Sequence, residues 1–95
     1  MEDQDSLNEF FKVLGSAATR DILTSIREGN NQHKDFLKFG SISTINQRTK
    51  QLVNLDIIEH HLGREEMRRE WYTLTERGER VVKAIPELEK AYLGE

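Results

Sequence analysis

One stretch of this 95-residue chain, Lys34–Leu74, constrains the fold more than any other. Its centre, Ser41–Ile58 (SISTINQRTKQLVNLDII), predicts a helix, because apolar side chains recur there at helical spacing with polar ones between them. The buried stripe that this spacing predicts consists of Ile45, Thr49, Leu52 and Leu55. The helix therefore has one face for a core and one for a partner or for water.

A short helix and a turn are predicted before this segment. The short helix covers Lys34–Phe39, and Gly40 gives the sharp turn that follows it. Its inward-pointing side chains are expected to be Phe36, Leu37 and Phe39. Either Ser41 or Ser43 can cap the second helix, and the sequence does not decide between them.

Two strands are predicted after the second helix. Asp56 ends that helix, Ile57–Leu62 forms the first strand, and Met67–Leu74 returns after a loop over Gly63–Glu66. Two helices joined by a turn and followed by a strand pair are the parts of a winged helix-turn-helix, with the helix-turn-helix at residues 34–55 and the wing at residues 57–74. The predicted fold class is mainly α with a small β-hairpin wing (α+β).

Further helices are predicted on both sides of this unit. A helix over residues 6–14 carries one apolar stripe, which packs either on its own domain or on a partner subunit. A scaffold helix capped by Ser16 runs to about Glu28. The last segment, residues 75–93, begins at Thr75, and Pro86 either kinks one long helix or starts a second short one. Because residues 1–95 fit one domain, and a small domain buries little surface alone, we expect residues 6–14 and 75–93 to form a homodimer interface.

The residue types that the chain lacks exclude several classes of site. There is no cysteine, so disulfides, thiolate metal sites and cysteine nucleophiles are excluded, which fits a reducing compartment. His33, His60 and His61 lack metal-site spacing, and no phosphate loop, nucleophile motif or apolar carboxylate pair occurs. We expect no metal, no cofactor and no enzymatic activity. The sequence contains neither a secretory signal nor an apolar run of the roughly 20 residues that a membrane span needs, so we expect a cytoplasmic protein without a membrane partner.

The polar face of the helix at Ser41–Ile58 suits the major groove of DNA. Its residues predicted to contact DNA are Ser43, Thr44, Asn46, Gln47, Arg48 and Lys50. Asparagine and glutamine can bind adenine edges bidentately, arginine and lysine can reach guanine or a phosphate, and hydroxyls beside first-turn amides suit a phosphate oxygen. The alternative is an ordinary solvated helix face, but its place after a short helix and before a strand pair favours DNA.

Arginines in the predicted hairpin extend this surface. Arg64, Arg68 and Arg69 suit a minor groove or the flanking backbone, although they could instead pair on the surface with the neighbouring acids. Between Gln32 and Leu55, four basic residues accompany one acidic residue, whereas the whole chain carries a net charge of −3. The positive charge is therefore modest and lies where the motif would meet DNA.

The chain resembles the winged-helix regulators of bacteria and archaea, in particular the MarR, ArsR and HxlR groups. The resemblance covers roughly residues 12–82 and rests on QRTKQLVNLDIIEHH followed by YTLTERG. It implies a homodimer that binds inverted repeats and represses or activates nearby genes. Asp56 stands where these families usually have glycine, and the cysteines that their metal-sensing and redox-sensing members use are missing.

The expected function is therefore a sequence-specific double-stranded DNA-binding transcriptional regulator, acting as a homodimeric repressor on a palindromic operator. The alternative is a winged-helix protein–protein interaction module without specific DNA binding, which the low net basicity supports. The sequence identifies no small-molecule effector.

Overall fold

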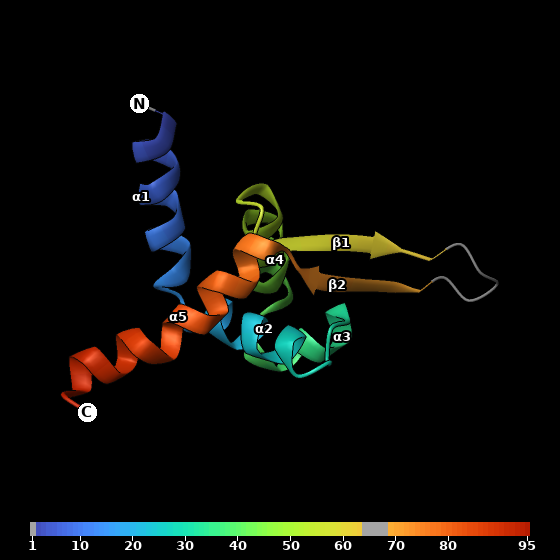
Figure 1. Ribbon diagram of the computed structural model, residues 1–95. Coiled ribbons are helices and arrows are strands. Elements are labelled where there is room, and N and C mark those ends of the chain that lie inside the picture. Colours follow the sequence, from blue (N-terminus) through green and yellow to red (C-terminus); the bar gives the residue numbers. More distant parts are fainter. Residues whose placement is uncertain (1, 64–68) are drawn as a thin grey trace.

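The computed structural model describes residues 2–63 and 69–95. These residues form five α-helices and one antiparallel β-hairpin (Figure 1). The helices are α1 (Glu2–Leu14), α2 (Ala17–Arg27), α3 (His33–Phe36), α4 (Ile42–Asn54) and α5 (Glu76–Leu93), and the strands are β1 (Ile58–Leu62) and β2 (Glu70–Leu74). The predicted mainly helical α+β class is confirmed. In the described ranges, no helix combines the length and the apolar character needed to cross a membrane.

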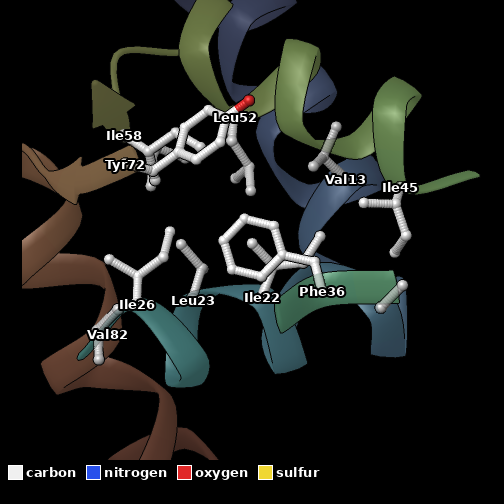
Figure 2. Close-up of a cluster of buried hydrophobic side chains, with 12 residues drawn as sticks. Val13, Ile22, Leu23, Ile26, Phe36, Ile45, Leu52, Ile58, Tyr72 and Val82 are labelled. Atoms are coloured by element: carbon white, nitrogen blue, oxygen red, sulfur yellow. The ribbon is translucent and has the colours of Figure 1, made fainter. Parts of the chain in front are cut away.

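The hydrophobic core forms around α2, which packs against α3, α4 and the hairpin (Figure 2). Each of the three helices contributes fully buried side chains: Ile22 and Leu23 of α2, Phe36 of α3, and Ile45 and Leu52 of α4. Burying such a side chain stabilises the fold by roughly 1.5–3 kcal/mol. The apolar stripe predicted for α4 is confirmed, and α2 buries a stripe of the same kind, because residues spaced three and four apart share the inward face of a helix.

The connection between α2 and α4 differs from its prediction in two details. α3 is only one turn long and passes into a 3-10 turn at Leu37–Phe39. Leu37 was expected to point inward, which is wrong: it is 38% exposed, because Phe36 fills the core and the turn carries the next side chain outward. Gly40 has an extended backbone (φ 167°) that any residue adopts, so the turn does not depend on a glycine there.

Both ends of α4 have a local chemical cause. The Ser41 hydroxyl accepts a hydrogen bond from the Thr44 backbone amide (3.1 Å), which makes Ser41 rather than Ser43 the cap. At the other end Asp56 has a positive φ of 60°, a left-handed conformation that aspartate tolerates better than most residues. The prediction that Asp56 ends the helix is confirmed.

Hydrogen bonds from Thr75 tie the start of α5 to the end of α4. The Thr75 backbone amide donates to the Ile57 carbonyl (3.0 Å), and its hydroxyl donates to the Asp56 carbonyl (2.6 Å). The same hydroxyl accepts from the Gly78 amide (3.0 Å) and so caps α5, at the residue where the sequence predicts that this segment begins. One side chain therefore serves two elements. We call this junction, residues 55–57 with residues 75–78, the α4–α5 clamp.

Two further residues complete the α4–α5 clamp. Gly78 is buried, and a Cβ at this position would overlap the Ile57 carbonyl oxygen. Arg77 Nη1 donates to the carbonyl oxygen of Leu55 (2.9 Å), the C-cap residue of α4, where carbonyls have no partner within the helix. The TERG segment in the sequence thus has a structural role at each of three positions, Thr75, Arg77 and Gly78.

The hairpin is fixed in register and anchored at its base. Ile58 pairs with Leu74 and Leu62 with Glu70, and the Gly63 amide donates to the Arg69 carbonyl (2.7 Å). The return strand was predicted from Met67, which lies outside the described residues; within them it begins at Glu70. The strands β1 and β2 extend away from the helical body (Figure 1), so their outer ends, at Leu62 and Glu70, are available to a partner.

The helices α1 and α5 diverge from the core and from each other (Figure 1). α1 begins at Glu2 rather than at Ser6 as predicted, because Asp3 and Asp5 favour the positive N-terminal end of a helix. α5 runs through Pro86 as one helix, so of the two alternatives the single long helix is confirmed.

Apolar side chains of α1 and α5 line the space between these two helices. Phe11 is 57% exposed, Leu88 63% and Tyr92 90%. Between the two helices lies an open hollow of about 570 Å³, lined mainly by Phe10, Phe11, Leu14, Val81, Ile85 and Leu88. We call these residues, with Tyr92, the α1–α5 surface.

Candidate nucleic-acid interface

Four of the predicted DNA-contacting residues form one exposed stripe along α4. Ser43, Asn46, Gln47 and Lys50 are all exposed and follow each other at spacings of three, one and three residues. Such residues share one face of a helix. Asn54 is exposed as well and continues the stripe by one turn. Asn54 was not among the predicted contacts, although its spacing from Lys50 indicates the same face.

Thr44 lies beside this stripe and is engaged in the helix cap. Its hydroxyl accepts a hydrogen bond from the Ser41 hydroxyl (2.9 Å), while its backbone amide donates to the same Ser41 oxygen. The Thr44 side chain is only half-exposed. Its position in the first turn of α4 keeps it near the backbone amides that can face an anion.

Arg48 lies on the other flank of α4, toward α1. Its side chain is half-buried, its Nη1 donates to Gln51 Oε1 (3.0 Å), and Gln51 Nε2 in turn donates to Glu9 Oε1 on α1 (3.5 Å). Arg48 and the exposed stripe therefore do not share a face. The prediction that Arg48 belongs to the same DNA-contacting face as the stripe is therefore wrong, because the contact from Gln51 to Glu9 on α1 has no signal in the local sequence.

The stripe is linked to α3 by a side-chain contact. His33 Nε2 lies 2.7 Å from Asn46 Oδ1, within hydrogen-bond distance. His33 is half-buried and Asn46 exposed, so the bond lies at the edge of the stripe. The two residues are 13 positions apart in sequence, and no local pattern predicts that they meet.

The hairpin carries aromatic and charged side chains on both faces. Arg69 is exposed, with its guanidinium carbon 5.9 Å from the centroid of the Trp71 ring, a cation–π distance. On the same face His61 stacks on Trp71 with ring centroids 5.2 Å apart. Arg64 and Arg68, the other two predicted hairpin contacts, lie outside the described residues. The described part of the hairpin therefore contributes one exposed arginine.

The three histidines lie in separate environments. His60 stacks on Tyr72 (4.9 Å) and pairs with Glu70 (2.6 Å), whereas His61 Nε2 lies 2.7 Å from Thr73 Oγ1 on the opposite face. The adjacent histidines point apart because neighbouring strand residues alternate between faces. Within residues 2–63 and 69–95, no three His, Asp or Glu side chains gather as metal ligands would.

Tyr72 joins the hairpin to the core beneath α4. Burial raises the pKa of the Tyr72 phenol above its ordinary value, and the nearby Glu70 carboxylate raises it further, while a hydrogen bond with Thr49 acts in the opposite direction. The Tyr72 backbone amide donates to the Asn31 carbonyl (2.9 Å), which ties β2 to the segment before α3. The hairpin, α3 and α4 are thus held relative to one another.

Positive charge around the stripe comes from α4 and the α3 region. Lys50 lies in the stripe, and Lys34 and Lys38 are exposed on α3 and the turn after it. Lys38 Nζ lies 5.4 Å from the centroid of the Phe39 ring, which holds it close to the protein surface. These cations and the polar stripe form a surface that can meet an anionic partner.

Comparisons of the chain with protein families, with curated proteins and with solved structures return no match. The geometry of α4, α3 and the hairpin therefore carries the functional interpretation.

Proposed function

We propose that the chain is a sequence-specific double-stranded DNA-binding transcriptional regulator of the winged helix-turn-helix class. The observation that carries this proposal is the exposed stripe of Ser43, Asn46, Gln47 and Lys50 along α4. Short polar side chains with amide groups, next to a cation, are what base edges in a major groove require. The sequence resemblance to winged-helix regulators supports the same interpretation.

In this proposal α4 enters the major groove and the hairpin acts as the wing. Asn46 and Gln47 bind base edges, and Lys50 binds guanine or a phosphate. Ser43, with Thr44 and the first-turn amides, faces the DNA backbone. Arg48, held by Gln51, adds positive charge beside the groove rather than a base contact.

The wing follows the minor groove or the backbone through its arginines. Arg69 is exposed at the outer end of the described hairpin, and Arg64 and Arg68 belong to the segment that joins β1 to β2. Arginine suits a narrow minor groove because the negative potential there is enhanced.

We also propose that the chain acts as a homodimer through the α1–α5 surface. The exposed side chains of Phe11, Leu88 and Tyr92 support an apolar interface, which a second copy of the same surface can cover. In such a dimer the two α4 helices lie about 34 Å apart and the operator is palindromic. A bound dimer excludes other proteins from the operator, so we propose a repressor, working in the cytoplasm of a prokaryotic cell.

The test is selection from a random duplex library, with sizing of the selected complex. We expect a palindromic site and two chains per duplex. Asn46→Ala or Gln47→Ala should cost about 1–3 kcal/mol at one base pair in each half-site. Arg69→Ala should weaken all duplexes alike and reduce the salt dependence, because it removes a phosphate contact.

The control for this test is Lys83→Ala on α5, outside the DNA-facing surface, which should leave binding unchanged. The proposal is wrong if selection enriches no sequence, or if neither the Asn46 nor the Gln47 variant changes base preference.

A second candidate function is a module that binds another protein through α4. Ile42, 63% exposed at the start of α4, favours this candidate, because an exposed apolar side chain is common in protein interfaces. Retention on heparin at low salt separates the two candidates. Lack of retention favours the protein-binding module, and elution that shifts with salt favours DNA.

A further inference from the structure

The hydrogen bond between His33 and Asn46 joins two elements that meet only in the folded chain. His33 is the first residue of α3, and Asn46 lies in the exposed stripe of α4. Their side-chain atoms Nε2 and Oδ1 are 2.7 Å apart. Because a carbonyl oxygen accepts and cannot donate, the imidazole nitrogen is the donor.

The backbone that carries His33 is fixed on both sides. The Asn31 carbonyl accepts from the Tyr72 amide (2.9 Å), which ties the preceding segment to β2. The Gln32 amide donates to Asp35 Oδ2 (2.9 Å), which closes the first turn of α3. Three residues after His33, Phe36 is fully buried in the core. The imidazole therefore projects from a rigid support.

The backbone of Asn46 is fixed as well. The Thr49 hydroxyl donates to the Asn46 carbonyl (3.1 Å) and to the Ile45 carbonyl (3.0 Å), and the Ile45 side chain is fully buried. What remains free in Asn46 is the rotation of its side-chain amide. The bond to His33 restrains that rotation, because it holds Oδ1 toward α3.

The restrained amide has a definite pattern of remaining donors and acceptors. Asn46 Oδ1 has two lone pairs, of which His33 uses one, and the Nδ2 group keeps its two hydrogens. One acceptor and one donor therefore remain side by side at the edge of the amide. Adenine presents the complementary pair, a donor at N6 and an acceptor at N7, in the major groove.

We propose that His33 is a positioning residue that sets base specificity through Asn46, by fixing the amide in the orientation that pairs with adenine. This inference rests on the proposed function and adds to it a residue of α3, outside the α4 stripe, that determines base specificity. Without the imidazole donor the amide can turn over, and its exposed edge then presents the acceptor and the donor in the opposite order. That edge no longer matches adenine in the same pose.

The experiment uses the duplex selected by the full chain, together with its three single-base variants at the adenine whose preference is lost in Asn46→Ala. His33→Ala should lower the preference for adenine over the other bases about fivefold or more, the loss of one hydrogen bond of about 1 kcal/mol. His33→Gln should keep the preference within about twofold, because its amide nitrogen can donate from a similar position.

Two controls separate positioning from general effects. The double variant His33→Ala/Asn46→Ala should show the same preference as Asn46→Ala alone, because His33 acts only through Asn46. Lys34→Ala, the exposed neighbour on α3, should weaken all four duplexes alike through lost phosphate attraction. Thermal unfolding of each variant measures any loss of stability independently.

The outcomes distinguish this inference from the function on which it rests. If the library yields no duplex, the proposed DNA-binding function fails and the inference fails with it. If a duplex is selected but His33→Ala keeps the base preference, weakens all four duplexes equally, or adds to the effect of Asn46→Ala, the inference alone is wrong. It is also wrong if Asn46→Ala changes preference at no base pair.

Discussion

The α4–α5 clamp holds the first turn of α5, whereas the α1–α5 surface runs along the rest of that helix, and the two regions differ in how their side chains find partners. In the clamp, the Thr75 hydroxyl and the Arg77 guanidinium meet carbonyls of the same chain. On the α1–α5 surface, Phe11 and Leu88 remain more than half exposed. The clamp therefore contributes to the stability of one chain, whereas the exposed side chains of the surface, Phe11, Leu88 and Tyr92, can be buried only by association. Variants in the clamp should therefore lower the free energy of unfolding, whereas variants on the surface should weaken association.

The largest expected effect is that of Gly78→Ala in the clamp. The added Cβ would overlap the Ile57 carbonyl oxygen, and two pieces of backbone would have to separate. We expect a loss of at least about 3 kcal/mol in the free energy of unfolding, the upper range for overpacked sites. Urea unfolding measures it.

Gly40→Ala is the matched control for this variant. A Cβ at Gly40 would lie 3.6 Å from its nearest neighbour, an ordinary contact, and the backbone there is extended. We expect a change below about 1 kcal/mol, the usual scale of such exchanges. Equal losses for the two alanines would contradict the steric account of Gly78.

Leu88→Glu on the α1–α5 surface should act on association instead of folding. A charge in an apolar interface should raise the dissociation constant of the proposed dimer by at least about thirtyfold, corresponding to about 2 kcal/mol. Lys83→Glu introduces the same side chain on the same helix outside the hollow and should leave association unchanged. Sedimentation at several concentrations measures both. A wild-type chain that remains monomeric throughout would remove the homodimer from the proposal.

Asp56 gives a smaller effect that sharpens the account of the clamp. Because its φ is positive, Asp56→Gly should relieve strain and stabilise the chain by about 0.5–1 kcal/mol, whereas Asp56→Ala should destabilise it by a similar amount. Thermal unfolding of the two variants checks the opposite signs. Shifts in the same direction would show that the Asp56 side chain, and not its backbone, decides stability at this turn.

The smallest effect concerns alkaline pH. The folded chain holds the pKa of Tyr72 above its ordinary value, so above about pH 10 the unfolded chain loses this proton first. The contribution to stability is present below pH 10 and is lost as the pH rises through the folded pKa. Tyr72→Phe should therefore make the decline in unfolding free energy above pH 10 less steep.

Tyr92→Phe is the control for the alkaline measurement at concentrations where the chain is monomeric, because this tyrosine is 90% exposed in the single chain. It should follow the wild-type curve in urea unfolding between pH 8 and pH 11. Parallel curves for Tyr72→Phe and the wild type would exclude Tyr72 as a source of the pH dependence.

Part of the local chemistry at helix ends could be predicted from the sequence. α5 begins after Thr75 as expected, because a helix start needs only the residue itself and the amides of the next turn. Ser16 was expected to cap α2, which is wrong in one respect: it occupies the N-cap position but makes no side-chain hydrogen bond there. The stripe of Ile45, Thr49 and Leu52 is buried as expected, because its spacing alone defines a face. The prediction that Leu37 points inward was wrong because spacing does not define a face here. A helix of one turn has no stable face, and the following 3-10 turn changes the direction of each side chain.

The candidate site was less predictable, since its grouping depends on which element each flank of α4 meets. Arg48 and Lys50 are both basic residues on the polar side of the predicted helix. In the structure Arg48 bonds to Gln51, which contacts Glu9 on α1, whereas Lys50 stays exposed. The bond between His33 and Asn46 depends on how α3 packs against α4. Such long-range packing has no signature in composition or spacing.

The α4–α5 clamp also joins the two residues that flank the hairpin in the sequence. The hydrogen bond from the Thr75 amide to the Ile57 carbonyl joins the residue before β1 to the residue after β2. It does not involve the chain between the two strands. Extra residues inserted between Gly63 and Arg69 would add loop-closure entropy of only about 0.6 kcal/mol for each doubling of loop length. We therefore expect that the length of the connection between β1 and β2 can change without altering the helical body.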